Sequence, residues 1–125
     1  MNDRFKFRAK RIDNNKFVYG YLCFIYIDNE KHCKIYSSDD AMSYDCYTET
    51  LGQCTGLKDR NGRLIYAGDI LGNKDFISDV ALLKYNNEKC CYILERRSVD
   101  ERFNKWWADM LMVIGNIHEN KELLK

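Results

Sequence analysis

Alternating apolar and charged residues at the start of the chain predict a short β-strand. In RFKFRAKR, from Arg4 to Arg11, cations fall on one side and apolar residues on the other, a pattern typical of a half-buried strand. FVYGYLCFIYI (17–27) is rich in β-branched and aromatic residues and predicts a second strand that forms a hairpin with the first. HCKIYS (32–37) predicts a third strand, whereas residues 37–52 have no clear period and are expected to form a connection.

A glycine-rich stretch, GQCTGLKDRNGRLIYAGDIL from Gly52 to Leu71, predicts several chain reversals in close succession. Asn61-Gly62 signals a two-residue hairpin of type I′, in which both central residues need positive φ. Asp69 is expected to accept backbone N–H bonds at the next corner. A phosphate-binding loop is disfavoured, because the glycines are followed by β-type residues and no helix start. The predicted structural turn residues are Gly52, Gly56, Asn61, Gly62, Gly68 and Asp69.

The second half of the chain predicts one more hairpin and the two helices. DVALLKYNN and KCCYILERR (79–97) pair about a turn at Asn86-Asn87. The last residues predict a strand up to Ile117 and a short C-terminal helix capped by Asn120.

The main amphipathic helix is expected to begin at Ser98, where SVDE matches a capping box closed by Glu101. The residues predicted on its buried face are Val99, Phe103, Trp106 and Met110. Trp107 is rotated from this face by one residue step, so we expect it to be exposed beside Arg102 and Lys105. Exposed tryptophan next to cations is the composition of a protein-interface hot spot.

Length and composition favour a globular chain that works in the cytoplasm. At 125 residues, with 46% hydrophobic residues and no apolar run long enough to span a bilayer, we expect one domain and no membrane association. Two small β subdomains, about 1–50 and 51–125, sharing a core are the alternative. The basic N-terminus lacks the apolar segment of a secretory signal, so the six cysteines are expected to be reduced.

Neither a metal site, nor a cofactor, nor a catalytic centre is expected from the sequence. The cysteines include no C-x-x-C pair, although His32 and Cys33 could converge with Cys46 or Cys54. An acidic cluster in the 37–52 connection is interpreted as solvated. A pairing of His118 as base with Cys54 as nucleophile has no support from spacing. We therefore predict a protein that is not an enzyme.

Three segments resemble the YopX family of phage and prophage proteins. They are KFRAKRIDNNKFVYG, GQCTGLKDRNGRLIYAGDIL and VIGNIHENKELLK, and they cover about two-fifths of the chain. Cys54 stands where the family usually has an aromatic residue, Ala67 where glutamate is common, and Lys121 where proline usually starts the terminal helix. The resemblance implies a mainly β fold of small SH3-like barrels and a phage or prophage context, and it implies no catalytic residues.

Protein binding is the predicted function. The expected partner is a host or phage protein or a second copy in a homo-oligomer, in the host cytoplasm, and inhibition of a host defence or replication component is one way to act. The predicted partner-binding residues are Trp107, Arg102 and Lys105. The alternative is nucleic-acid binding through the basic strand, although a net charge of +1 excludes a strong field over the whole molecule. The residues of that alternative are Arg4, Lys6, Arg8 and Lys10. A third hypothesis is a protein that sequesters a small nucleotide through Tyr, Trp and Arg side chains.

Overall fold

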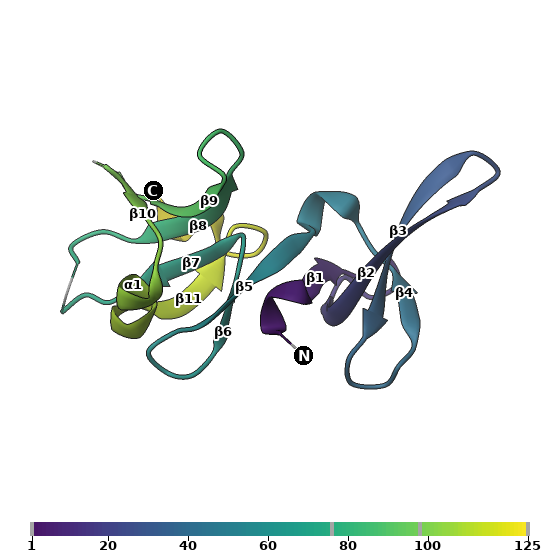
Figure 1. Ribbon diagram of the computed structural model, residues 1–125, viewed down its shortest axis with the longest axis horizontal. Coiled ribbons are helices and arrows are strands. Elements are labelled where there is room, and N and C mark those ends of the chain that lie inside the picture. The colour runs from purple at the N-terminus through teal and green to yellow at the C-terminus, as the bar shows by residue number, and fades with distance from the viewer. Residues whose placement is uncertain (1, 76, 98, 125) are drawn as a thin grey trace. The chain divides into compact units, whose positions relative to one another are not determined.

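The computed structural model describes residues 2–75, 77–97 and 99–124, so Ser98 of the expected capping box lies outside the described residues. The fold is mainly β, with two antiparallel sheets and one short α-helix (Figure 1). The chain divides into two compact units, Met1–Cys54 and Thr55–Lys125. Each unit contains a hydrophobic cluster of its own.

The first unit is built on an antiparallel sheet whose strand order is β4-β3-β2-β1-β5. Its strands are β1 (Phe7–Lys10), β2 (Phe17–Ile27), β3 (Glu30–Ser37), β4 (Ser43–Asp45) and the first residues of β5 (Gly52–Lys58). Two 3₁₀-helices, η1 (Asp3–Phe5) and η2 (Thr48–Thr50), precede β1 and β5. Strand β4 lies in the stretch expected to be a connection. The buried cluster of this unit is Ala9, Val18, Cys33, Ile35 and Cys46.

Gly20 allows the long hairpin of the first unit to close tightly. A Cβ atom at this position would lie 1.8 Å from the backbone oxygen of Tyr36, a distance that no side chain can adopt. Gly20 pairs with Phe7 on one side and with Ser37 on the other. A glycine within a strand thus marks a close approach of backbone rather than a turn.

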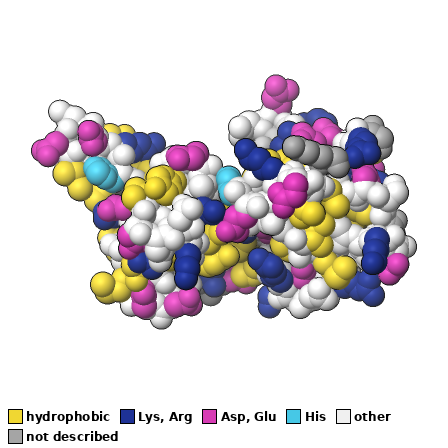
Figure 2. All heavy atoms as spheres, turned by 180° about the vertical axis from the view of Figure 1, so that it is seen from behind, with side chains coloured by type: hydrophobic (Ala, Val, Ile, Leu, Met, Phe, Trp, Pro, Cys, Tyr) yellow, Lys and Arg dark blue, Asp and Glu magenta, His cyan; other side chains and the backbone are white. Residues whose placement is uncertain are grey.

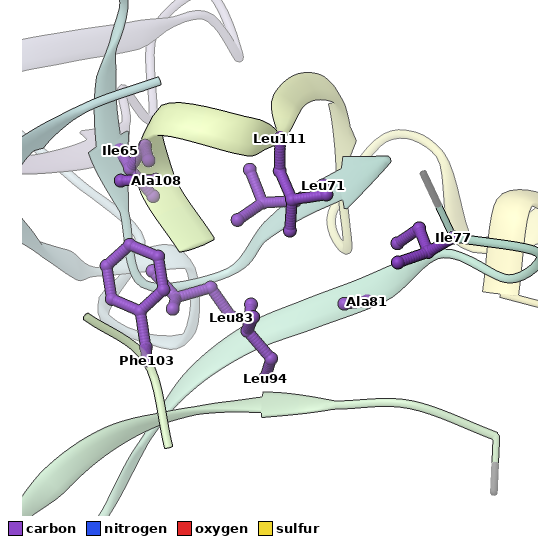
Figure 3. Close-up of a cluster of buried hydrophobic side chains, with 9 residues drawn as sticks. All are labelled: Ile65, Leu71, Ile77, Ala81, Leu83, Leu94, Phe103, Ala108 and Leu111. Carbon is purple, nitrogen blue, oxygen red and sulfur yellow. The ribbon is translucent and has the colours of Figure 1, made fainter. Parts of the chain in front are cut away.

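The second unit combines the rest of β5 with β6 (Leu64–Tyr66) and a five-stranded antiparallel sheet of order β10-β9-β8-β7-β11. Its remaining elements are β7 (Asp69–Gly72), β8 (Ala81–Asn86), β9 (Cys91–Glu95), β10 (Asp100–Arg102), α1 (Lys105–Met110), β11 (Met112–Asn116) and the 3₁₀-helix η3 (Lys121–Leu124). Nine buried apolar side chains from these elements and from the segments between them meet in one core (Figure 3). Within the described residues neither sheet closes into a barrel, and the SH3-like architecture stays a prediction.

The main helix begins later than the sequence suggested. Residues 100–102 form strand β10, in which Glu101 pairs with Leu94 of β9 instead of reaching back to a helix start. Asn104 caps the helix, because its side-chain oxygen accepts a hydrogen bond from the Trp107 amide at 3.2 Å. The predicted capping box is therefore wrong: strand pairing satisfies the backbone of 100–102, and α1 has only six residues.

The buried carboxylate of Asp59 organises the glycine-rich corner. One oxygen accepts from the Asn61 amide at 2.9 Å and the Arg63 amide at 2.8 Å, and the other accepts from the Val113 amide of β11 at 2.8 Å. Asp59 is 6% exposed, so water replaces these bonds poorly. This one side chain closes the β5–β6 turn and ties it to the five-stranded sheet.

The turn itself differs from the expected type I′ hairpin. Gly62 has φ +83°, whereas Asn61 is not among the residues with positive φ. The Gly62 amide donates to the Asp59 carbonyl, and the Asp59 amide donates to the Arg63 carbonyl. This is a three-residue loop, in which a type I turn ends in a left-handed glycine. Asp69 similarly accepts a 2.7 Å hydrogen bond from the Tyr66 amide at the next corner.

Asp59→Ala is expected to destabilise the protein by about 3 kcal/mol, because three backbone amides lose a charged acceptor in a buried place. Urea unfolding checks this value. Asp109→Ala is the control, since Asp109 is exposed and its carboxylate pairs with the Lys105 side chain of the same helix. Equal unfolding midpoints for the two variants would contradict the role assigned to Asp59.

Gly62→Val is expected to cost about 1–3 kcal/mol, because a β-branched residue adopts a left-handed φ only with strain. The strain is confined to the backbone, since a Cβ atom here meets nothing within 4 Å. Gly62→Asn should cost clearly less, because asparagine tolerates this region. Thermal unfolding of the pair measures the difference, and equal losses would show that the cost is not conformational.

Candidate protein-binding surfaces

The two adjacent tryptophans of α1 take opposite roles to those expected. Trp106 is 55% exposed, whereas Trp107 packs against the buried cluster of the second unit. Their rings meet edge to face, with centroids 5.0 Å apart and planes at 82°. The assignment of Trp107 as the exposed residue is therefore wrong, and the exposed aromatic ring on this helix belongs to Trp106.

The register of α1 explains why Trp106 is exposed and Trp107 packs against the core. Counting from the cap at Asn104, the residues that face the core are Trp107, Ala108 and Leu111, which follow one another at helical spacing. Phe103, just before the cap, belongs to the same cluster. The sequence carried this signal, because Phe103, Trp107 and Leu111 recur every four residues, but the SVDE motif favoured the other register.

Charged side chains accompany Trp106 in the chain. Arg102 and Lys105 are both exposed, and Lys105 forms an ion pair with Asp109 at 2.9 Å. Arg102 also lines a hollow of about 420 Å³ beside strands β9 and β10. We call Trp106, Arg102 and Lys105 the Trp106 surface.

An ion pair between two partly buried side chains joins the segment before β8 to the segment after β9. Arg96 bonds Asp79 at 3.0 Å, and its guanidinium lies 5.8 Å from the centre of the Trp107 ring. Burial alone would raise the pKa of Asp79, but the hydrogen bond and the charge of Arg96 outweigh it and lower the pKa. The pair lines a hollow of about 350 Å³ that therefore contains both signs of charge.

The four N-terminal cations do not form one exposed row. Arg4 belongs to the 3₁₀-helix η1, and Lys6 forms an ion pair with Asp3 at 3.5 Å. Arg8 is only 1% exposed, with its guanidinium 4.7 Å from the centre of the Phe17 ring, and Lys10 lies 5.6 Å from the same ring. The expected continuous strand from Arg4 is wrong, because β1 begins at Phe7 and lies between β2 and β5. Nucleic-acid binding by these residues stays a prediction.

A second exposed surface was not singled out from the sequence. Strands β2 and β3 continue as a two-stranded hairpin past the residues that pair with β1 and β4 (Figure 1). Large apolar side chains remain exposed on it, including Tyr26 at 70% and Ile27 at 49%. Figure 2 shows hydrophobic side chains on this hairpin, at the upper left. The sequence did contain a signal for this surface, namely the nearly unbroken apolar run of β2. A strand with one buried face needs apolar residues only at alternate positions.

Known proteins resemble this chain in sequence and in structure. A family model described as YopX protein matches residues 6–125. The chain belongs to the YopX family. The resemblance seen in its three motifs is thereby confirmed. The chain is also similar to the crystal structure of protein EF1440 from Enterococcus faecalis, with 26% identity, a TM-score of 0.59, and coverage of 96% of this chain and 97% of that one. A search of curated proteins gave no match.

Neither a membrane-spanning helix nor a cluster of metal ligands occurs in the part of this YopX family member that the structure describes. No helix among residues 2–75, 77–97 and 99–124 is long and apolar enough to cross a bilayer. Over the same residues, no cluster of three or more histidine, cysteine or acidic side chains is arranged to hold a metal ion.

The cysteines are free thiols of very different accessibility. Cys33, Cys46 and Cys54 are buried, whereas Cys90 is exposed. Burial raises the pKa of Cys33, and burial together with the nearby Cys33 thiol raises the pKa of Cys46 to about 11. Neither thiol is activated as a nucleophile, because activation requires a lowered pKa.

The thiols are expected to react with Ellman's reagent in two groups at about pH 8. Cys90 should react within the first phase, and the buried thiols Cys33, Cys46 and Cys54 only as the protein opens. In denaturant without reductant all six should react. Cys90→Ser should remove amplitude from the first phase. A Cys46 thiol that reacts as fast as Cys90, or fewer than six reactive thiols after unfolding, would contradict this assignment.

Proposed function

We propose that this YopX family member is a non-enzymatic phage or prophage accessory protein that binds a host or phage protein in the host cytoplasm. The observation that carries the proposal is the exposure of 55% of the Trp106 side chain on a short helix. Tryptophan is among the residues that contribute most to protein interfaces. Inhibition of a host defence or replication component is the action that the phage context of the family favours.

Rigid presentation of the Trp106 ring supports this role. The Trp107 ring behind it is held by the core, and the Asn104 cap fixes the first turn of the helix. The edge-to-face contact between the two rings adds a preferred orientation for Trp106. A side chain that is already ordered loses little conformational entropy on binding, so more of its contact energy contributes to affinity.

The charged residues close to Trp106 in the chain suit the margin of an interface. Arg102 and Lys105 are exposed cations, and the Lys105 ammonium forms an ion pair with Asp109. An aromatic anchor surrounded by polar side chains is the usual anatomy of a protein-binding patch.

Trp106→Ala is expected to weaken partner binding by roughly 2 kcal/mol or more while the fold stays intact. Proteins captured by the tagged chain from nuclease-treated host lysate are identified, and the affinity of each purified candidate is then measured by calorimetry. Tyr85→Ala is the matched control, because Tyr85 is also exposed and also meets a half-buried ring, Tyr92, edge to face at 5.2 Å.

Two outcomes would overturn the proposal. One is an equal loss of affinity in Trp106→Ala and Tyr85→Ala, which would show that the Trp106 surface has no special role. The other is capture that disappears on nuclease treatment, which would favour the nucleic-acid hypothesis. Circular dichroism of each variant checks that the fold is retained.

A further inference from the structure

The hairpin of β5 and β6 carries its charge at the tip. Residues 52–68 contain four charged side chains, and all lie close to the turn, at Lys58, Asp59, Arg60 and Arg63. The three cations are exposed, whereas Asp59 is only 6% exposed. Figure 1 shows the loop between β5 and β6 as a turn that projects from the strands. We call Lys58, Arg60 and Arg63 the basic tip.

The cations of the basic tip are available to an external anion. The one acid in the loop, Asp59, directs both carboxylate oxygens to the backbone amides of Asn61, Arg63 and Val113. Within the described residues, no ion pair involves any of the three cations of the basic tip. An anion can therefore bind them without first breaking an internal pair.

The segment that packs against this loop adds no opposing charge. The Arg60 amide donates to the Leu111 carbonyl at 2.9 Å, and residues 110–113 are all apolar. Asp109, the acid that precedes them, is paired with Lys105 at 2.9 Å. Because charge interactions in water are screened beyond about 8 Å at physiological salt, the basic tip acts as a local positive patch although the whole chain has a net charge of only +1.

The backbone under the basic tip is held in one conformation. The Asp59 amide donates to the Arg63 carbonyl at 2.8 Å, and the Gly62 amide donates to the Asp59 carbonyl at 2.9 Å. The Asp59 carboxylate adds its bonds to the same loop and to β11. A loop that is ordered before binding loses little backbone entropy on binding, so the contacts of its side chains contribute more to affinity.

We propose that the basic tip binds the phosphate backbone of duplex DNA. Residues 58–63 contain no apolar side chain except that of glycine-free contacts to the core, so the tip lacks the apolar centre of a protein interface and has the polar, positive character of a nucleic-acid interface. Arginine binds phosphate through two parallel N–H groups, and a two-stranded β-ribbon fits the major groove of B-DNA. Contacts to phosphate do not read bases, so the binding is independent of sequence. This proposal is independent of the Trp106 surface.

The salt dependence of DNA binding tests the proposal. The full chain is titrated into a fluorescent DNA duplex of mixed sequence at several salt concentrations, and binding is followed by anisotropy. Three phosphate contacts predict a slope of about −2.7 for the logarithm of the binding constant against that of salt concentration. Arg60→Gln and Arg63→Gln should each bring the slope about 0.9 closer to zero, since each removes one contact. Lys89→Gln is the control, because Lys89 is an exposed cation beside Glu88 on the turn between β8 and β9.

Four outcomes would overturn the proposal. The first is no binding of the duplex by the wild type even at low salt. The second is an equal effect of Arg60→Gln and Lys89→Gln. The third is equally tight binding of polyglutamate, which would indicate an acidic protein as the partner. The fourth is loss of binding in Lys6→Gln with none in Arg60→Gln, which would assign the DNA contact to the N-terminal cations. The substituted side chains are exposed and the backbone bonds of the loop remain, so the variants are expected to fold.

Discussion

Backbone hydrogen bonding at the ends of short strands is the constraint on which this fold depends. The second unit contains many brief strands and one six-residue helix, so many of its amides lie where a strand ends. Buried polar side chains satisfy them. The Asp59 carboxylate bonds three amides, and Asn116 accepts from the His118 and Glu119 amides at the start of the last turn. These bonds hold corners that apolar packing alone would leave free to vary.

The same constraint applies to the ends of strands in the first unit. Thr50 accepts from the Lys10 amide and donates to the Tyr47 carbonyl, which closes the end of β1. Among the described residues, no strand pairs with the β1 side of β2 beyond Gly20, although β2 is the longest strand there. The exposed Trp106 ring lies in the other unit.

Much of the local structure was predictable from the sequence, because it depends on local chemistry. Residues 17–27 form a strand as their β-branched and aromatic content indicated, and Gly62 adopts positive φ at the reversal. The helix was placed wrongly because SVDE and Asn104 are both good caps, and the choice between them depends on residues 100–102 pairing with β9, which is a contact distant in sequence. That choice then decided which tryptophan is exposed.

The candidate surfaces were less predictable than the fold. Alternation in RFKFRAKR predicted an exposed row of cations, but β1 is a central strand and Arg8 lies over the Phe17 ring of its neighbour. The exposed apolar residues of β2 depend on how far β1 extends, and pattern alone does not give the length of a pairing. Their chemical signal, seven residues without charge at 21–27, was nevertheless in the sequence.

Hydrogen exchange of the amides that bond Asp59 tests the central claim most directly. We expect the Asn61, Arg63 and Val113 amides to be protected in the wild type and to exchange much faster in Asp59→Ala, because each then loses its acceptor. The His118 amide, which bonds Asn116, should change much less. Equal protection of the Asn61, Arg63 and Val113 amides in the two proteins would contradict the account.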